Sequence, residues 1–229
     1  MTENLNPAQI RSLIEFLDAF VTDERKKRFD EILDARIGHM HVVLEDVYQA
    51  HNASAVLRSA DCFGIQHVHF IENRNRYKVS DEVALGASQW LSIERHSSTK
   101  DALFKLKKDG FKIVATTPHT NDKTIYEFDV TQKFALVFGT EKDGITQEAL
   151  DLSDEFVKIP MHGFTESFNV SVCAALCMHE LSNKIRGQVK DPYLPKEEKQ
   201  GIYLNWQRQT IRKCDLLIKD FLNKNAHLS

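Results

Sequence analysis

The chain lacks the features that mark several common protein classes. Its four cysteines form no CxxC pair, and no apolar run approaches the roughly 18 residues that a membrane-spanning helix needs. The GxSxG turn of many hydrolases, the phosphate-binding loop of NTPases and the GxGxxG motif of dinucleotide-dependent dehydrogenases are all missing. The opening residues, MTENLNPAQI, contain neither the basic nor the apolar part of a signal peptide. We therefore expect a protein of the reducing cytoplasm.

The histidines and cysteines give no metal-binding pattern. His67 and His69 alternate along one predicted strand, but no carboxylate or cysteine stands at metal-ligand spacing from them. Cys173 and Cys177 lie four residues apart in a helical segment, where we expect small core residues. The sequence therefore predicts no metal ion.

The charge is distributed unevenly, although the formal net charge is only −3. From Lys184 to Ser229 there are ten Lys and Arg against five Asp and Glu, and the N-terminal segment contains the basic cluster Arg25-Lys26-Lys27-Arg28. A polyanion such as nucleic acid could bind these basic ends. The alternative from charge alone is a solvated helix face.

The order of apolar patterns predicts an α/β domain between two helical ends. Helices are expected over residues 7–21 and 23–37, the second with Thr22 as its N-cap, and a last helix over residues 195 to about 223. Between them, predicted strands at 41–45, 67–72, 111–116, 134–138 and 156–159 alternate with helices such as 52–63 and 99–109. This alternation indicates a mainly parallel sheet flanked by helices. The expected division is 1–40, 41–188 and 189–229.

The first candidate ligand loop follows the apolar strand FALVF. Gly139 and Gly144 permit close backbone approach or a positive φ angle, and Glu141 between them is placed to point into a cleft or to be a solvated loop acid. In parallel sheets, ligands bind outside the carboxyl ends of the strands, where this loop begins. The loop is therefore predicted to contribute to a ligand site.

The second candidate loop follows the strand FVKI. The proline after Ile159 holds that residue extended, so that unpaired backbone groups could bind an adenine edge between the apolar walls of Met161 and Phe168. Ser167 and Asn169 stand at the start of the next predicted helix, as N-cap residues or as functional groups. The two loops together predict one ligand site built largely from backbone.

A third element, HNASAVLRSADCFG, follows the first predicted strand of the domain. Asn52 could cap its helix, and Arg58 could pair with Asp61 three residues later. Alternatively, Arg58 in the second turn of a helix could bind phosphate or ribose.

These three elements resemble the motifs of a known family. NxxxxxR followed by a glycine, then LVFGxExxGI, then IPMxGxxxSxNVSVxxAxxxxE, are similar in order and spacing to the motifs of the SpoU branch of the SPOUT RNA 2′-O-methyltransferases. The resemblance covers about residues 42–180. The helical ends resemble those of the branch that methylates the D-loop guanosine of tRNA at position 18.

The resemblance implies a fold, a reaction and a set of site residues. It implies a C-terminal trefoil knot in the α/β domain, a homodimer whose active site lies at the subunit interface, and transfer of a methyl group from S-adenosyl-L-methionine to a ribose 2′-hydroxyl. It implies cofactor contacts from Thr116, Gly139, Ile159, Met161 and Phe168. The implied catalytic residues are Arg58, Asn52, Glu141, Ser167 and Asn169.

The end segments are expected to bind the RNA. The basic residues implied are Arg25, Lys26, Lys27, Arg28, Lys184 and Arg186. Lys184 and Arg186 stand where relatives usually carry paired arginines, and Phe168 stands where leucine is common. The alternatives are methylation of another tRNA position or of rRNA, and a non-catalytic RNA-binding protein with this fold, and the role of the helix at residues 7–20 stays open.

Overall fold

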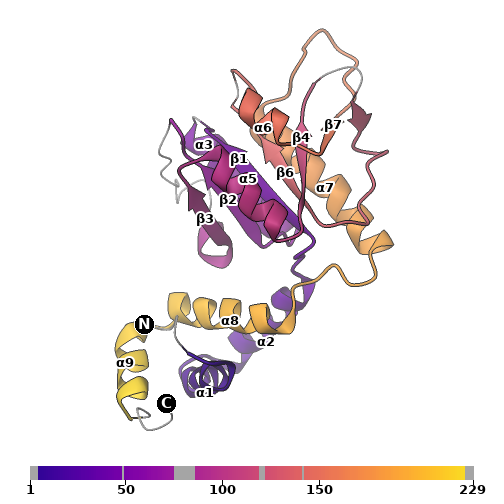
Figure 1. The fold of residues 1–229 in the computed structure, drawn as a ribbon. Helices are drawn as coiled ribbons and strands as arrows, with labels where there is room; N and C mark the ends of the chain where they lie inside the picture. The colour runs from indigo at the N-terminus through magenta and orange to yellow at the C-terminus, as the bar shows by residue number, and fades with distance from the viewer. Residues whose placement is uncertain (1–4, 48, 75–85, 119–121, 141, 225–229) are drawn as a thin grey trace. The chain divides into compact units, whose positions relative to one another are not determined.

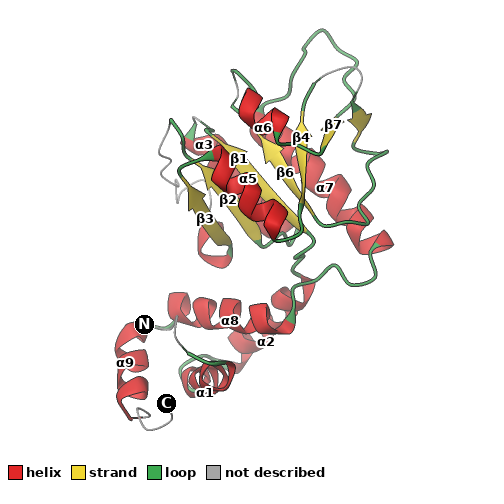
Figure 2. Cartoon of the chain, viewed as in Figure 1, coloured by secondary structure: helices red, strands yellow, loops and turns green. Residues whose placement is uncertain are grey.

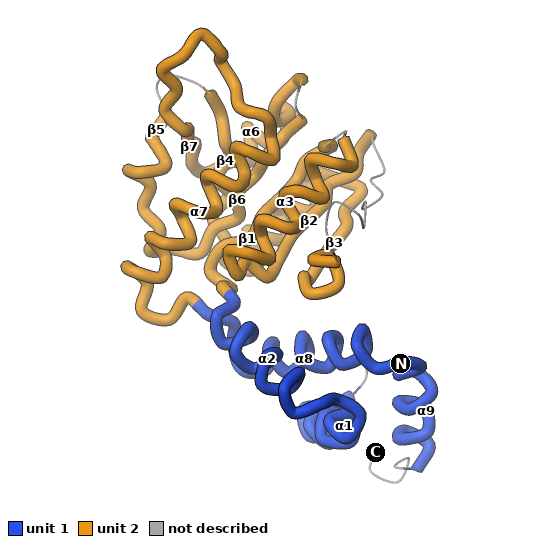
Figure 3. Tube along the Cα trace, turned by 180° about the vertical axis from the view of Figure 1, so that it is seen from behind, with its two compact units in different colours: residues 1–36, 193–229 blue, residues 37–192 orange. Residues whose placement is uncertain are grey.

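The computed structural model describes residues 5–47, 49–74, 86–118, 122–140 and 142–224. They group into two compact units. One runs from Ile37 to Pro192, and the other combines the N-terminal segment up to Arg36 with the C-terminal segment from Tyr193 (Figure 3). The two helical ends of the sequence therefore fold together as one unit. The expected division into 1–40, 41–188 and 189–229 treated them as two separate segments.

The central unit is built on a seven-stranded sheet. Its order is β3-β2-β1-β6-β4-β7-β5, and every pairing between neighbours is parallel. The strands are β1 (Met40–Glu45), β2 (His67–Ile71), β3 (Ser92–His96), β4 (Lys112–Thr116), β5 (Lys123–Thr124), β6 (Phe134–Phe138) and β7 (Glu155–Lys158). The expected α/β class with a parallel sheet is confirmed, while the trefoil knot remains a prediction.

Helices cover both faces of this sheet (Figures 1 and 2). On one face, α3 (Ala50–Cys62) and α7 (Val170–Gln188) pack on strand residues such as Val42, Leu136 and Phe138. On the other, α5 (Thr99–Lys108) and α6 (Gln147–Asp151) pack on the alternate residues, among them Val43 and Val137. Successive strand residues point to opposite faces, so a strand buried on both sides reads as a continuous apolar run.

A layer of histidines lies on one face of β1, β2 and β3. The rings of His41 and His67 stack with centroids 4.3 Å apart, and those of His41 and His69 at 5.1 Å. Burial lowers the pKa of His69 to about 3 and holds the pKa of His41 well below its ordinary value. The His41 and His69 rings are therefore neutral at physiological pH.

The terminal unit is helical. It contains α1 (Pro7–Asp18), α2 (Asp23–Ala35), α8 (Lys196–Thr210) and α9 (Cys214–Lys224), with an apolar core that includes Leu13, Leu17 and Ile218. Gln207, which is buried, donates from Nε2 to the carbonyl of Ile14 and to Asp18. Helix α1 therefore belongs to the core of this unit, which gives the helix expected at residues 7–20 a structural role.

Several local predictions are confirmed and some are wrong. Thr22 accepts from the N–H of Arg25 as the N-cap of α2, and β6 has the predicted bounds. Strands β3 and β5 were missed, because β3 (SIERH) is mostly half-exposed and lacks an apolar run and β5 has two residues. The last helix was predicted as one segment, but it breaks into α8 and α9 near Lys213, whose φ is +58°.

A short 3₁₀ helix, η1 (Ala87–Trp90), precedes β3. No helix among the described residues has both the length and the apolar character that crossing a bilayer requires.

Candidate functional site: a cavity at the carboxyl ends of three strands

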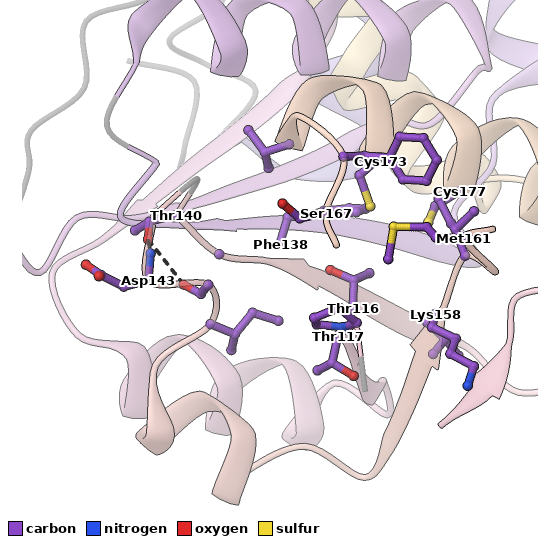
Figure 4. Close-up of a pocket in the computed structure, with 18 of the residues that line it drawn as sticks. Thr116, Thr117, Phe138, Thr140, Asp143, Lys158, Met161, Ser167, Cys173 and Cys177 are labelled. Carbon is purple, nitrogen blue, oxygen red and sulfur yellow. Dashed lines mark hydrogen bonds between the residues drawn. The ribbon is translucent and has the colours of Figure 1, made fainter. Parts of the chain in front are cut away.

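A cavity of about 380 Å³ lies where β4, β6 and β7 end (Figure 4). This volume falls within the range of small-molecule sites, and the carboxyl edge of a parallel sheet is where such sites form. The cavity is lined by all five residues expected to contact a cofactor: Thr116, Gly139, Ile159, Met161 and Phe168. Ser167, expected to be catalytic, lines it as well.

The glycine loop after β6 is held in a tight turn. The N–H of Thr140 donates to the carbonyl of Gly144 at 2.9 Å, and the N–H of Gly144 donates back to Thr140 at 3.1 Å. A Cβ atom on Gly139 would lie 2.1 Å from the carbonyl oxygen of Gly144, and Gly144 itself has φ of +70°. The two glycines therefore meet different needs: Gly139 permits close backbone approach, and Gly144 a left-handed conformation.

The second loop leaves its backbone available. Within the described part of the chain, no backbone hydrogen bond uses an N–H or C=O group of residues 159–168. Met161 and Phe168 present apolar surface from this loop to the cavity. Since unpaired backbone groups next to apolar walls suit a planar heterocycle with a polar edge, the loop has the character that the sequence predicted.

Asn52 and Asn169 meet at the start of two helices. Asn169 donates from Nδ2 to Oδ1 of Asn52 at 3.2 Å, while its own Oδ1 accepts from the N–H of Ser171 as the N-cap of α7. Asn52 is buried in the first turn of α3 and donates to Gln49, which is the N-cap of that helix. The alternative reading of Asn52 as a cap is therefore wrong, whereas Asn169 is a cap and a partner of Asn52 at once.

Arg58 lies apart from the cavity lining. Its side chain is exposed on α3, and it is not among the described residues that line the cavity. Glu141 lies outside the described residues. The structure thus brings together Asn52 with Asn169, and Ser167 with the five expected cofactor residues, but it does not place Arg58 beside them.

A buried carboxylate that sequence reasoning missed anchors the glycine loop. Glu45, at the end of β1, accepts from the N–H and the hydroxyl of Thr146 at 2.9 and 2.7 Å, and from the hydroxyl of Thr99 at 2.6 Å. Its side chain is fully buried. The signal was present in the sequence as an acid ending the apolar strand MHVVLE. Glu45 fixes the far end of the loop that begins at Gly139.

Cys173 and Cys177 form a thiol pair on the cavity wall. Cys177 is buried in the apolar core and Cys173 packs against that core, as expected, but both also line the cavity. The hydrogen bond from the Cys177 thiol lowers the pKa of Cys173, and the same bond, with burial, raises the pKa of Cys177 well above its usual value. Cys173 is therefore the more acidic thiol at the site.

The expected RNA-binding residues fall into two groups. Arg25, Lys27 and Arg28 are exposed on α2; Lys26 pairs with Asp23 at 2.6 Å, and Arg28 with Glu31 at 3.7 Å. The Lys184 ammonium donates to the carbonyls of Tyr126 and Phe128, at 3.0 and 2.7 Å.

Arg186 makes comparable contacts. Its guanidinium donates to the carbonyls of Ser182 and Phe63, at 3.3 and 2.8 Å. An RNA contact at Lys184 or Arg186 would therefore compete with main-chain hydrogen bonds. On α2, Arg25 and Lys27 are exposed, while Lys26 and Arg28 form ion pairs with acids of the same helix.

Comparison with known proteins identifies the family. Residues 39–179 match the model of the SpoU rRNA Methylase family. The tRNA (guanosine(18)-2′-O)-methyltransferase of Borreliella burgdorferi is 38% identical over 89% of this chain and 94% of its own, and that of Thermus thermophilus is 34% identical over 82% and 98%. The solved structure of the A. aeolicus TrmH/SpoU tRNA modifying enzyme has a TM-score of 0.76, with 29% identity over 83% of this chain and 98% of its own.

The chain belongs to the SpoU methylase family, as its three sequence motifs predicted. It is a methyltransferase, and S-adenosyl-L-methionine is the cofactor of the family. The cavity residues fit that cofactor. The tight turn at Gly139 and Gly144, the backbone of residues 159–168, which makes no backbone–backbone hydrogen bond among the described residues, and the apolar walls of Met161 and Phe168 suit a polar, adenine-bearing molecule.

Proposed function

We propose that this chain transfers a methyl group from S-adenosyl-L-methionine to the ribose 2′-hydroxyl of guanosine 18 in the D-loop of tRNA. The observation that carries the proposal is the single cavity that gathers Ser167 with all five expected cofactor residues. The choice of tRNA is supported by relatives of that activity which this chain matches over most of its length.

The bound cofactor supplies an electrophilic methyl group on its sulfonium sulfur. Transfer to a hydroxyl is an in-line displacement, so alignment of the two reacting atoms contributes much of the rate. The turn between Thr140 and Gly144 and the loop after β7 fix the cofactor side of this alignment. Glu45 in turn holds the glycine loop after β6 in place through its hydrogen bonds to Thr146.

Arg58 is proposed to bind the 3′-phosphate of the target nucleotide and to polarise the 2′-hydroxyl. A guanidinium whose pKa exceeds about 12 is a poor base near neutral pH, but its planar donors suit a phosphate. Asn52 and Asn169, already joined by a hydrogen bond, are proposed to orient the nucleotide next to Ser167. Glu141 is proposed to hold Asn52 or Arg58 in place.

We infer a homodimer that completes this site. Val172 and Leu176 are exposed on one side of α7, four residues apart, and the neighbouring Phe164 and Phe168 are exposed as well. An apolar stripe of this kind marks an interface in a protein of this size. A second copy on this stripe would bring its own Arg58, which lies apart from the cavity within one chain, toward the cofactor.

The helical unit is proposed to bind tRNA through α2. Arg25, Lys27 and Arg28 are exposed there, and such contacts to phosphates give affinity and register without sequence preference. The proposed tRNA substrate leads us to propose the cytoplasm as the place of action.

The decisive experiment incubates the protein with labelled S-adenosyl-L-methionine and unmodified tRNA transcripts, then maps the product by its resistance to alkaline cleavage. We expect one 2′-O-methylguanosine, at position 18 of the D-loop. A transcript whose guanosine 18 is replaced by a 2′-deoxy residue serves as control and should accept no methyl group. Methylation at another nucleotide would support the proposed reaction but would refute guanosine 18 as its target.

Arg58→Ala separates binding from transfer. Because Arg58 is exposed, we expect the affinity for the cofactor, measured by calorimetry, to stay within about twofold of the parent value. Single-turnover transfer should fall by about 100-fold or more, since the side chain that binds the 3′-phosphate is lost. Arg28→Ala, on α2, is the matched control for RNA affinity and should raise KM rather than lower the rate at saturation. Weakened cofactor binding with unchanged turnover of the bound enzyme would contradict the role given to Arg58.

Ribosomal RNA is the second candidate substrate, because the family model carries that description. The same assay with rRNA fragments distinguishes it: transfer to rRNA and not to tRNA would replace the proposed target. A non-catalytic RNA-binding role would require binding of both RNA and cofactor with no transfer to either substrate.

A further inference from the structure

Two adjacent strands bring three metal-ligating side chains to one face of the sheet. Strands β2 and β3 pair in parallel, with His69 opposite Glu94 and Ile71 opposite His96. Because residues two apart on a strand share a face, Glu94 and His96 lie on the same side as His69. This is the one group of three such residues, within the described parts of the chain, whose ligand atoms all lie within 4.8 Å of one another.

The distances between the donor atoms are close to those of a metal site. Nδ1 of His69 lies 3.1 Å from Nε2 of His96 and 3.5 Å from Oε2 of Glu94. Ligand atoms about 2.0–2.1 Å from a tetrahedral Zn²⁺ are separated from one another by about 3.3–3.4 Å. The two observed separations lie on either side of this value, and the third, between Glu94 and His96, is within 4.8 Å.

We propose that His69, Glu94 and His96 form a binding site for a divalent transition-metal ion, with Zn²⁺ as the ion that the donors fit best. Two neutral imidazoles, one carboxylate and a water molecule make up a common four-coordinate zinc environment. The ion replaces the hydrogen bond between the His69 and His96 rings, and each ring then carries its single proton on its other nitrogen. No net proton release is needed from these two rings.

Two neighbouring residues fix the orientation of the ligands. Nε2 of His69 lies 3.0 Å from Nδ1 of His41, so the His69 ring can donate to His41 while its Nδ1 faces the ion. This is the usual arrangement for a metal-binding histidine, in which the second ring nitrogen donates to a fixed partner. Lys105, on α5, forms an ion pair with Oε1 of Glu94, which leaves Oε2 for the metal.

The position of the site indicates what the ion does. Strand β3 is at one end of the sheet order, while the cofactor cavity is lined from β4, β6 and β7 on the other side of β1. The ion would join edge strand β3 to β2 through side chains, in addition to the backbone pairing. It therefore stabilises the fold and takes no part in methyl transfer.

The test is a titration of untagged, metal-free protein with Zn²⁺ by calorimetry and with Co²⁺ by absorption. We expect one ion per chain and the ligand-field spectrum of four-coordinate cobalt, without the charge-transfer band that a thiolate ligand gives. With Zn²⁺ at 100 times its dissociation constant, the midpoint of thermal unfolding should rise by about 5–10 °C.

Matched variants locate the ion. His96→Gln and Glu94→Gln are partly exposed substitutions that should preserve the fold, checked by circular dichroism, and each should weaken Zn²⁺ binding at least about tenfold. His67→Gln, on the same strand as His69 but outside the proposed ligand set, should bind Zn²⁺ as the parent does. Absence of binding, a thiolate band with Co²⁺, or equal affinity in the parent and both ligand variants would each overturn the proposal.

Discussion

Substitution of Gly139 by alanine is the sharpest test of the cofactor loop. A Cβ atom there would lie 2.1 Å from the carbonyl oxygen of Gly144, 2.2 Å from its carbonyl carbon and 2.3 Å from the backbone nitrogen of Ile145. Real Cβ contacts essentially never fall below 3.0 Å, and all three neighbours are backbone atoms. The turn would therefore have to retreat by about 1 Å, because no flexible side chain can absorb the clash.

We expect the substitution to cause a large loss of cofactor affinity and methyl transfer and a moderate loss of stability. Overpacking of this kind costs about 1–3 kcal/mol of unfolding free energy, and a misplacement of about 1 Å can reduce catalysis about 100-fold. Calorimetry should show at least about tenfold weaker binding of S-adenosyl-L-methionine, and single-turnover transfer to tRNA should fall further.

Gly187→Ala is the matched control for this substitution. Gly187 lies near the end of α7, where an added Cβ meets no heavy atom within 4 Å, so alanine should stabilise the helix by about 0.5–1 kcal/mol and leave binding unchanged. If Gly139→Ala bound the cofactor as tightly as Gly187→Ala does, the tight turn would not be part of the cofactor site.

Three further predictions concern the loop anchor, the interface and the thiols. Glu45→Ala leaves the hydroxyl and N–H donors around it unpaired, so chemical denaturation should show a loss of about 3 kcal/mol, with a smaller loss for Glu45→Gln. Leu176→Glu should convert a dimer to monomers in light scattering and abolish transfer, whereas an unchanged dimer would refute the α7 interface. Iodoacetamide should modify Cys173 faster than Cys177 and more slowly once cofactor is bound, as read by mass spectrometry; equal rates with and without cofactor would contradict the placement of the thiols.

The residues of the cavity could be predicted because they stand in short, ordered motifs. Gly139 and Gly144 were chosen for their conformational freedom, and the structure shows the close approach at one and the positive φ at the other. Ile159 was chosen because the proline after it restricts its backbone and Met161 because it offers an apolar wall beside that proline, and both line the cavity. In each case the constraint is local, so it is visible in a few consecutive residues.

Other features depended on residues far apart in the chain. Glu45 and Thr146 are separated by 101 positions, and the local sequence around neither residue predicts the hydrogen bond between them. His69, Glu94 and His96 were invisible as a group because strand β3 is short and mostly polar, so its pairing with β2 was not foreseen. A search for metal ligands by spacing within one segment misses sets that only strand pairing assembles.

The amino-acid sequence by itself determined the family, the parallel α/β class and the two loops of the cofactor cavity, because each depends on local periodicity or on backbone restrictions at named glycines and prolines. Only the tertiary structure decided that the two helical ends fold as one unit, that Asn52 pairs with Asn169, and that Glu45 fixes the glycine loop. These features arise from packing and hydrogen bonding between distant segments. Such contacts form only after folding has brought these distant segments together, so no pattern in a few consecutive residues predicts them.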